Sequence, residues 1–188
     1  IDFRAYKVGN NIPAQMIAPE QPIIEFTFVK DGKEYHDTQF LSVEEGYDYV
    51  SSKVLNEERT KPKITDYSVS GPDGSDLTKA TFQGSRILII MYDVRKASGQ
   101  NIDALRSITK ELEGKVESLI LTSSSEEQIE LFRHEHQLAF DFAQGDEKVI
   151  KTVIRSNPGV VLLKKGTVMG LWHCNDAPDF AAAEAALK

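Results

Sequence analysis

A chain of 188 residues with 40% hydrophobic and 27% charged side chains has an ordinary globular composition and can bury one sizeable core. The net charge of −7 is concentrated in residues 1–60, where six Lys/Arg face eleven Asp/Glu. Without a basic cluster the chain has little with which to neutralise phosphates, so nucleic acid is a poor candidate partner. No apolar run approaches the roughly 18–20 residues that a membrane-spanning helix needs.

Residues 1–60 are predicted to form a β-rich extension. Residues 22–30 have strand composition, Asp31-Gly32 is a hairpin-turn signal, and residues 33–41 can return antiparallel. Residues 46–55 are ambiguous between a strand and a short helix. The polar stretch 56–62 is typical of a linker, which places a second domain over residues 61–188.

From residue 64 the pattern changes to an alternation of strands and helices. Ser124-x-x-Glu127 is a capping-box signal for one helix, and Gly114 ends another. Strand–helix alternation implies parallel crossovers, and Lys165-Gly166 adds an antiparallel hairpin. The sequence therefore predicts an α/β fold with a central mixed sheet. Strands are expected at 64–70, 87–92, 116–121, 138–142, 160–164 and 167–172, and helices from Asn101, Ser124, Asp146 and Asp176.

This order, with Pro158 just before the strand at 160–164, resembles the thioredoxin fold. The opening ITDYSVSGPDGSDLT looks like the entry of the peroxiredoxin-like and membrane-anchored thioredoxin branches. The segment IRSNPGVVLLKKGTVMG matches the proline loop and terminal hairpin of that family. The resemblance implies a thioredoxin-like sheet flanked by helices and a cis-proline at Pro158.

A closer resemblance covers nearly the whole chain. The segments IDFRAYKVGNNIP, EFTFVKDGKEY and IRSNPGVVLLKKGTVMGLWHCND together resemble the C-terminal soluble region of bacterial DoxX-family membrane proteins. This resemblance implies an extracytoplasmic domain on the periplasmic side, tethered by a preceding transmembrane region. The chain begins at Ile1 without an initiator Met, which fits excision after a transmembrane helix.

Thioredoxins carry a C-x-x-C pair between the first core strand and the following helix, where the helix N-terminus lowers the pKa of the attacking thiol. Here residues 92–101 occupy that position and contain no cysteine. Ser98 is no substitute, because an alkoxide is far less accessible than a thiolate near neutral pH. The sequence has one cysteine, Cys174, so dithiol chemistry within these residues is excluded by counting.

The remaining candidates form two groups. If the fold is right, Tyr92, Asp93, Arg95 and Lys96 lie across a groove from Asn157 and Pro158, where thioredoxin-like proteins bind extended peptides by strand addition. The lone Cys174 follows the last strand in Trp-His-Cys-Asn-Asp and is the candidate reactive thiol. No cofactor or metal site is expected, and no catalytic constellation is recognisable.

Three functions remain open. The first is a redox-inactive binding or regulatory module that holds a peptide or partner protein at the proline-loop groove. The second is a monothiol redox enzyme or sensor that acts through Cys174. The third is a structural domain that helps to assemble the membrane protein and leaves the groove unused.

Overall fold

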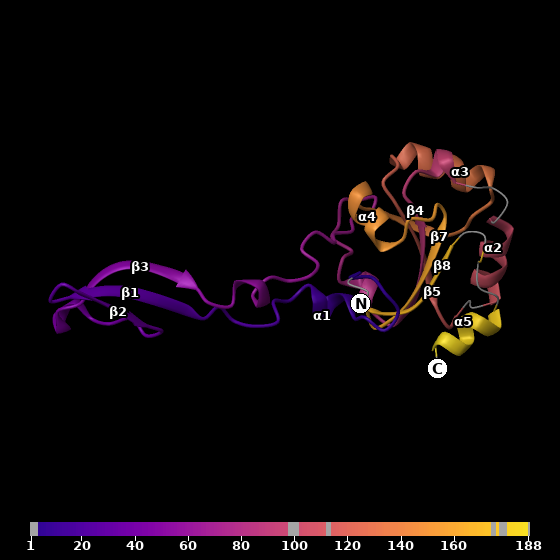
Figure 1. Cartoon of the computed structure of the whole chain (residues 1–188). Helices are drawn as coiled ribbons and strands as arrows, with labels where there is room; N and C mark the ends of the chain where they lie inside the picture. Colours follow the sequence, from indigo (N-terminus) through magenta and orange to yellow (C-terminus); the bar gives the residue numbers. More distant parts are fainter. Residues whose placement is uncertain (1–3, 98–101, 112–113, 174–175, 177–179, 188) are drawn as a thin grey trace. The chain divides into compact units, whose positions relative to one another are not determined.

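The computed structural model describes residues 4–97, 102–111, 114–173, 176 and 180–187. It divides into two compact units, one formed by Gln15–Lys63 and the other by Ile1–Ala14 together with Ile64–Lys188 (Figure 1). The sequence placed a boundary near residue 60 and assigned the first 14 residues to the smaller part. The structure joins residues 4–14 to the larger unit instead.

Backbone pairing explains why the first segment belongs with the larger unit. Gly9 N donates to Val168 O over 2.8 Å, and Ile12 N donates to Gly166 O over 2.9 Å. Asn11, just before the short helix α1 (Ile12–Gln15), donates from Nδ2 to Lys165 O over 3.1 Å. These bonds tie the segment to the terminal hairpin.

The smaller unit is an antiparallel sheet of order β2-β1-β3, formed by β1 (Ile24–Lys30), β2 (Lys33–Asp37) and β3 (Asp48–Val54). Asp31 and Gly32 both have positive φ, 52° and 72°, as the tight hairpin between β1 and β2 requires. Phe28 is fully buried against other aromatic side chains, and Asn56 is buried as well. Two 3-10 helices complete the unit, η1 (Val43–Glu45) and η2 (Glu57–Arg59).

The predicted linker at 56–62 has more structure than its polarity suggests. Asn56 Oδ1 accepts a hydrogen bond from Ile23 N over 2.8 Å, and its Nδ2 donates to Gln21 O over 2.9 Å. Asn56 thereby joins the two ends of the smaller unit.

The larger unit has a five-stranded sheet of order β6-β5-β4-β7-β8. The first three strands along the chain run parallel, and β7 and β8 are antiparallel to their neighbours. This arrangement confirms the predicted mixed α/β sheet. Its strands are β4 (Ser85–Met91), β5 (Glu117–Thr122), β6 (Asp141–Gln144), β7 (Gly159–Lys164) and β8 (Thr167–His173).

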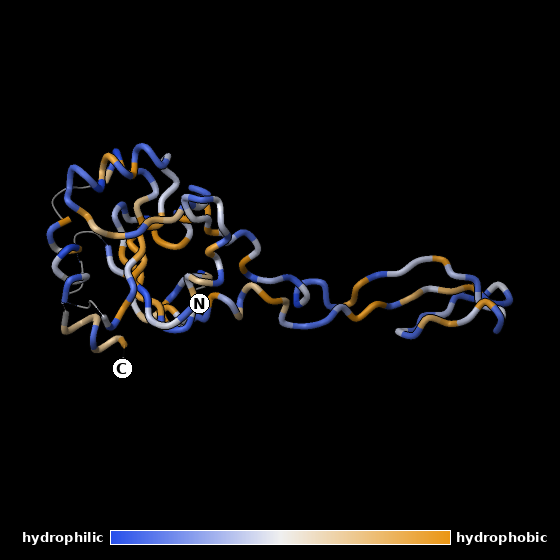
Figure 2. Tube along the Cα trace, turned by 180° about the vertical axis from the view of Figure 1, so that it is seen from behind, coloured by the Kyte–Doolittle hydropathy of each residue, from blue (hydrophilic) through white to orange (hydrophobic). Residues whose placement is uncertain are grey.

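Helices cover both faces of this sheet (Figure 1). Ile87, Ile89 and Met91 of β4 point into a core that also holds apolar side chains of three helices. Those helices are α2 (Ile102–Glu111), α3 (Glu126–Glu135) and α5 (Phe180–Leu187), while α4 (Glu147–Val153) lies against the other face. Figure 2 shows the hydrophobic residues concentrated on the central strands, as burial on both faces requires.

Two predicted strands differ from the structure. Residues 64–70 do not form a strand. Ile64, Tyr67 and Val69 are buried as an alternating strand would have them, but Val69 pairs locally with Leu77 and Thr78 and only Ser70 makes β-bridges. The strand predicted at 138–142 begins at Asp141, because Gln137 adopts a left-handed conformation (φ 52°) and delays the extended backbone.

Candidate functional site

The loop after β4 is built around the carboxylate of Asp93. This residue is 7% exposed and begins the 3-10 helix η4 (Val94–Lys96), where its Oδ1 accepts from Arg95 N over 3.1 Å. Arg95 binds both carboxylate oxygens, from Nε over 3.0 Å and from Nη2 over 3.1 Å, and Lys96 Nζ lies 3.0 Å from Oδ2. We call these three residues the ion cluster.

The ion cluster fixes the charge state of Asp93. The hydrogen bonds from Arg95 are the largest influence, followed by burial, which opposes them, and then by Lys96. Together they hold the pKa of the Asp93 carboxyl well below its usual range. At neutral pH this position therefore carries a buried anion and two exposed cations, because the Arg95 and Lys96 side chains are 67% and 73% exposed.

Side chains from neighbouring strands hold the backbone of this loop. Asn157 Nδ2 donates to Asp93 O over 2.7 Å, and Val94 N donates to Ser124 Oγ over 3.1 Å. Ser123 Oγ donates to Tyr92 O. The loop is thus tied both to the end of β5 and to the segment before β7, which leaves it little freedom to move by itself.

The proline loop lies beside the ion cluster because of the sheet register. Ile90 of β4 pairs with Gly159 of β7, which brings the preceding Asn157 and Pro158 to the carboxyl end of β4. The Asn157–Pro158 peptide bond is cis, and Ser156 Oγ donates to Pro158 O over 2.5 Å. Asn157 Oδ1 is buried and accepts no hydrogen bond within the described part of the chain.

Tyr92 lies differently from the other predicted groove residues. Its half-buried ring packs under Lys151 of α4, whose Nζ is 4.6 Å from the ring centroid. Lys151 also pairs with Glu147, and this hydrogen bond raises the pKa of the Lys151 ammonium. The structure therefore adds Lys151 to the candidate site, together with Ser123 and Ser124. The sequence marked Ser124 only as a helix-capping residue and gave no signal for Lys151 or Ser123, since only the fold brings the three near the end of β4.

A hollow of about 370 Å³ adjoins the ion cluster on the side of α3. Val94, Ala97 and Phe132 provide much of its apolar lining, and its polar lining comes from Arg95, Gln128, Glu135 and His136. Leu131 of α3 also lines it and is 68% exposed, so its side chain is available to a partner. The hollow lies within the volume range of ligand pockets, and Arg95 is the cation in its lining.

Of the sequence-predicted residues, the structure brings Asp93, Arg95, Lys96, Asn157 and Pro158 together, and it directs the Tyr92 ring toward α4. Cys174, the candidate reactive thiol, lies outside the described residues. Within the described ranges, no group of three or more His, Cys, Asp or Glu side chains could hold a metal ion.

Comparison with known proteins identifies the fold. The sequence matches no family profile and no curated protein. Among solved structures, the thioredoxin domain of a thiol-disulfide oxidoreductase from Bacteroides vulgatus has a TM-score of 0.51 at 11% identity, covering 65% of this chain and 93% of that one. A thiol peroxidase from Chromobacterium violaceum has a TM-score of 0.50 at 15% identity, covering 66% and 83%. The chain therefore has a thioredoxin-like fold.

Proposed function

We propose that this chain is a thioredoxin-like binding module that acts without a redox thiol and holds an extended peptide with acidic side chains beside the proline loop. The ion cluster is the observation that supports this proposal most. It occupies the loop where a thioredoxin carries its dithiol, and it offers charge in place of a nucleophile. The ion cluster and the hollow beside it would determine which partner binds at this loop.

The charges at this position favour an anionic partner. Asp93 is buried, so at the ion cluster an approaching molecule meets Arg95 and Lys96, while the far lining of the hollow adds one exposed carboxylate, Glu135. Exposed charges are screened over about 8 Å at physiological ionic strength, so these nearby cations outweigh the chain's overall charge of −7. A carboxylate on the partner would pair with them, and the hollow beside Leu131 would take an apolar neighbour.

An extended peptide is a better candidate than a small molecule because a peptide can also bind through its own main-chain N–H and C=O groups. Proteins that hold peptides next to a sheet do so by main-chain hydrogen bonds along an exposed backbone, with side-chain pockets providing the specificity. The proline loop and the hollow lie on two sides of the same 3-10 helix, so successive peptide residues could contact both.

Titration of ¹⁵N-labelled protein with two defined peptides tests the proposal. Acetyl-Glu-Leu-Glu-Leu-Glu-amide should shift the amide resonances of residues 92–97 and of Ser156, Asn157 and Gly159, and the shifts should weaken as salt is added. The lysine counterpart, acetyl-Lys-Leu-Lys-Leu-Lys-amide, should not. The double variant Arg95→Glu/Lys96→Glu should lose the response, whereas Lys110→Glu, a change at an exposed lysine of α2 that does not line the hollow, should keep it.

Absence of any shift would reject peptide binding and favour a purely structural role in assembly. The same shifts in the double variant would reject the role given to Arg95 and Lys96. The monothiol alternative is tested separately. Cys174→Ser should leave the titration unchanged, and iodoacetamide should alkylate Cys174 no faster than an ordinary thiol with a pKa of about 8.5. Faster alkylation at neutral pH would favour a reactive thiol.

We also propose that the chain is the extracytoplasmic C-terminal region of a DoxX-family membrane protein. The support is the sequence resemblance of three segments, at the start, in the β1–β2 hairpin and over β7 and β8. Within the described ranges, no helix combines the length and the apolar character that crossing a bilayer needs. Alkaline phosphatase fused after Lys188 of the full-length gene product should be active in cells. If the phosphatase fusion is inactive and a fluorescent protein fused at the same point is fluorescent, the domain lies in the cytoplasm and the proposal is refuted.

A further inference from the structure

The hollow beside the ion cluster runs along one face of helix α3. Gln128, Leu131, Phe132 and Glu135 all line it, and their spacing of three or four residues places them on the same side of the helix. The helical rise of about 1.5 Å per residue puts Glu135 about 10 Å beyond Gln128. An extended chain advances about 3.3 Å per residue, so this face can contact several consecutive residues of a bound peptide.

The two ends of this face offer opposite charges. Val94 N donates to Ser124 Oγ over 3.1 Å, and Ser124 immediately precedes the capping residue of α3, so η4 begins beside the N-terminal end of that helix. Arg95, the next residue of η4, is therefore the cation at this end of the hollow. Glu135 is the last residue of α3 and lies at the other end.

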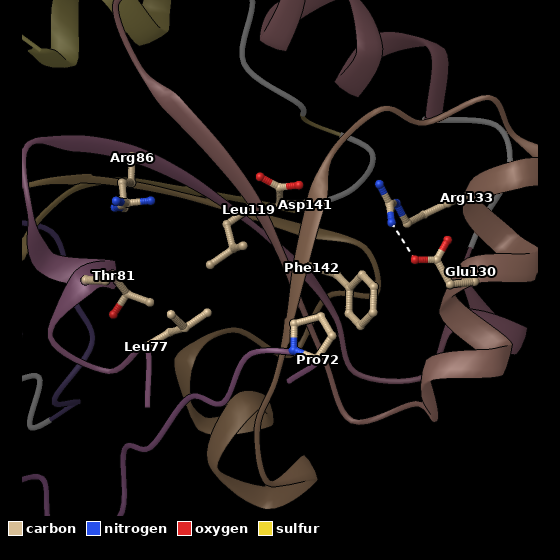
Figure 3. Close-up of a pocket in the computed structure, with 10 residues that line it drawn as sticks. Pro72, Leu77, Thr81, Arg86, Leu119, Glu130, Arg133, Asp141 and Phe142 are labelled. Carbon is tan, nitrogen blue, oxygen red and sulfur yellow. Dashed lines mark hydrogen bonds and ion pairs between the residues drawn. The ribbon is translucent and has the colours of Figure 1, made fainter. Parts of the chain in front are cut away.

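The carboxylate of Glu135 is available to a partner. It is exposed, and no cation of the described ranges pairs with it. The charges around it are already paired. On the opposite face of α3, Glu130 binds Arg133 over 2.8 Å beside a different cavity of about 420 Å³ (Figure 3). Arg106, which reaches the end of α3 from α2, binds Asp103 over 3.0 Å.

Between the charged ends the lining is apolar. Phe132 is buried, and its ring centroid lies 4.4 Å from that of His136. Leu131 is exposed beside it, so an apolar side chain of a partner would cover Leu131 and remove it from water. Along α3 the hollow thus offers a cation, then an apolar surface, then an anion.

We infer that the hollow selects a peptide segment with an acidic, an apolar and a basic side chain at alternate positions. The acidic side chain pairs with Arg95, the apolar one packs on Leu131, and the basic one pairs with Glu135. Alternate residues of an extended chain point to the same side, and two such steps span about 13 Å, which suits the length of this face. The inference rests on the proposed function, because it specifies which peptide the same site prefers.

Titration of ¹⁵N-labelled protein with three matched peptides tests the inference. Acetyl-Glu-Ser-Leu-Ser-Lys-amide and acetyl-Lys-Ser-Leu-Ser-Glu-amide carry the mixed charges in the two chain directions, and acetyl-Glu-Ser-Leu-Ser-Glu-amide carries acidic charges alone. The better of the two mixed peptides should bind about 3-fold or more tightly than the acidic one, because an attractive exposed pair with Glu135 replaces a repulsive one. It should also shift the amide resonances of residues 131–136.

Protein variants complete the test. Glu135→Lys should reverse the order, so that the acidic peptide binds about 3-fold or more tightly than either mixed peptide. Glu111→Lys makes the same charge change at an exposed residue of α2 outside the hollow, and it should keep the wild-type order. Circular dichroism spectra like that of the unmodified protein show that both variants are folded.

The outcomes separate this inference from the proposed function. If none of the three peptides binds, both are overturned. If the acidic peptide binds wild type as tightly as both mixed peptides or more tightly, only the inference about Glu135 is overturned. An unchanged order in folded Glu135→Lys, or a reversed order in Glu111→Lys, would also overturn it, because the preference would then come from the overall charge of the chain and not from this position.

Discussion

Replacement of Asp93 tests whether the ion cluster holds the loop after β4. Asp93→Ala removes the acceptor that begins η4, where Oδ1 takes the hydrogen bond from Arg95 N. Loss of such a cap costs about 1 kcal/mol, within a range of about 0.5–2. The ion pairs add little to this value, because the partner side chains are mostly exposed. We therefore expect Asp93→Ala to lower the free energy of unfolding by about 1–2 kcal/mol.

Asp93→Asn separates the cap from the charge. Asparagine is as good an N-cap as aspartate, so this variant keeps the acceptor for Arg95 N and loses only the carboxylate charge. It should cost less than half of what Asp93→Ala costs. For a chain of this size each kcal/mol lowers the melting temperature by about 2–4 °C, so both changes can be measured.

The charge of Asp93 also makes a pH-dependent contribution. The pKa of this carboxyl is lower in the folded state than in the unfolded state, chiefly because of its hydrogen bonds from Arg95. The stabilisation from the charge is therefore fully present above the unfolded pKa of about 3.9 and is lost as the pH falls toward the folded value. The stability difference between wild type and Asp93→Asn should be constant from pH 8 to about 5 and should shrink below about pH 4.

Urea unfolding monitored by circular dichroism at several pH values measures all of these differences. Equal stability of wild type and Asp93→Ala at pH 7 would refute the capping role. A wild-type advantage over Asp93→Asn that grows on acidification would show that the pKa is raised in the folded state, against the reasoning above.

Three further changes probe the frame of the site. Asn157→Ala removes the 2.7 Å hydrogen bond to Asp93 O. It should lower the free energy of unfolding by about 1 kcal/mol and speed amide hydrogen exchange at residues 95–97. Unchanged exchange would argue against a role of Asn157 in holding this loop. Gly166→Ala should destabilise by about 2–4 kcal/mol, because Gly166 has φ 75° and a Cβ there would lie 2.6 Å from Pro13 Cδ. Gly9→Ala, with φ 89° and open space, is its matched control and should cost about 1–2 kcal/mol, so equal costs in urea unfolding would contradict the contact with Pro13. Ser125→Ala removes the capping box of α3 and should cost about 1 kcal/mol by the same measurement, whereas no change would show the box to be unimportant.

The large-scale fold was predictable because local signals and burial agree there. The apolar run of β4 is buried along most of its length, and a capping box does begin α3, although it is formed by Ser125 and Gln128, one residue later than the predicted pair Ser124 and Glu127. The backbone pairing of segment 64–70 was harder to predict. Its apolar and polar residues alternate in the same way whether the segment pairs as a strand in a sheet or only packs its apolar side chains against the core. Local periodicity reports which side chains are buried, and it does not report which backbone groups pair.

The site shows a similar division. The position opposite Pro158 followed from the order of elements, and the lack of cysteine followed from counting. The burial of Asp93 and the roles of Ser124 and Lys151 depend on where β5 and α4 pass in three dimensions. The separation of these residues along the sequence gives no sign that they meet at the end of β4.

The central claim is that the loop opposite the proline has exchanged thiol chemistry for charge. Reduction of insulin by dithiothreitol, measured with and without the purified chain, tests this claim most directly. Wild type and Cys174→Ser should both give the rate of the protein-free reaction, because neither holds a dithiol in its 188 residues. A clear acceleration that survives Cys174→Ser would contradict the claim and would require a catalytic group other than a cysteine.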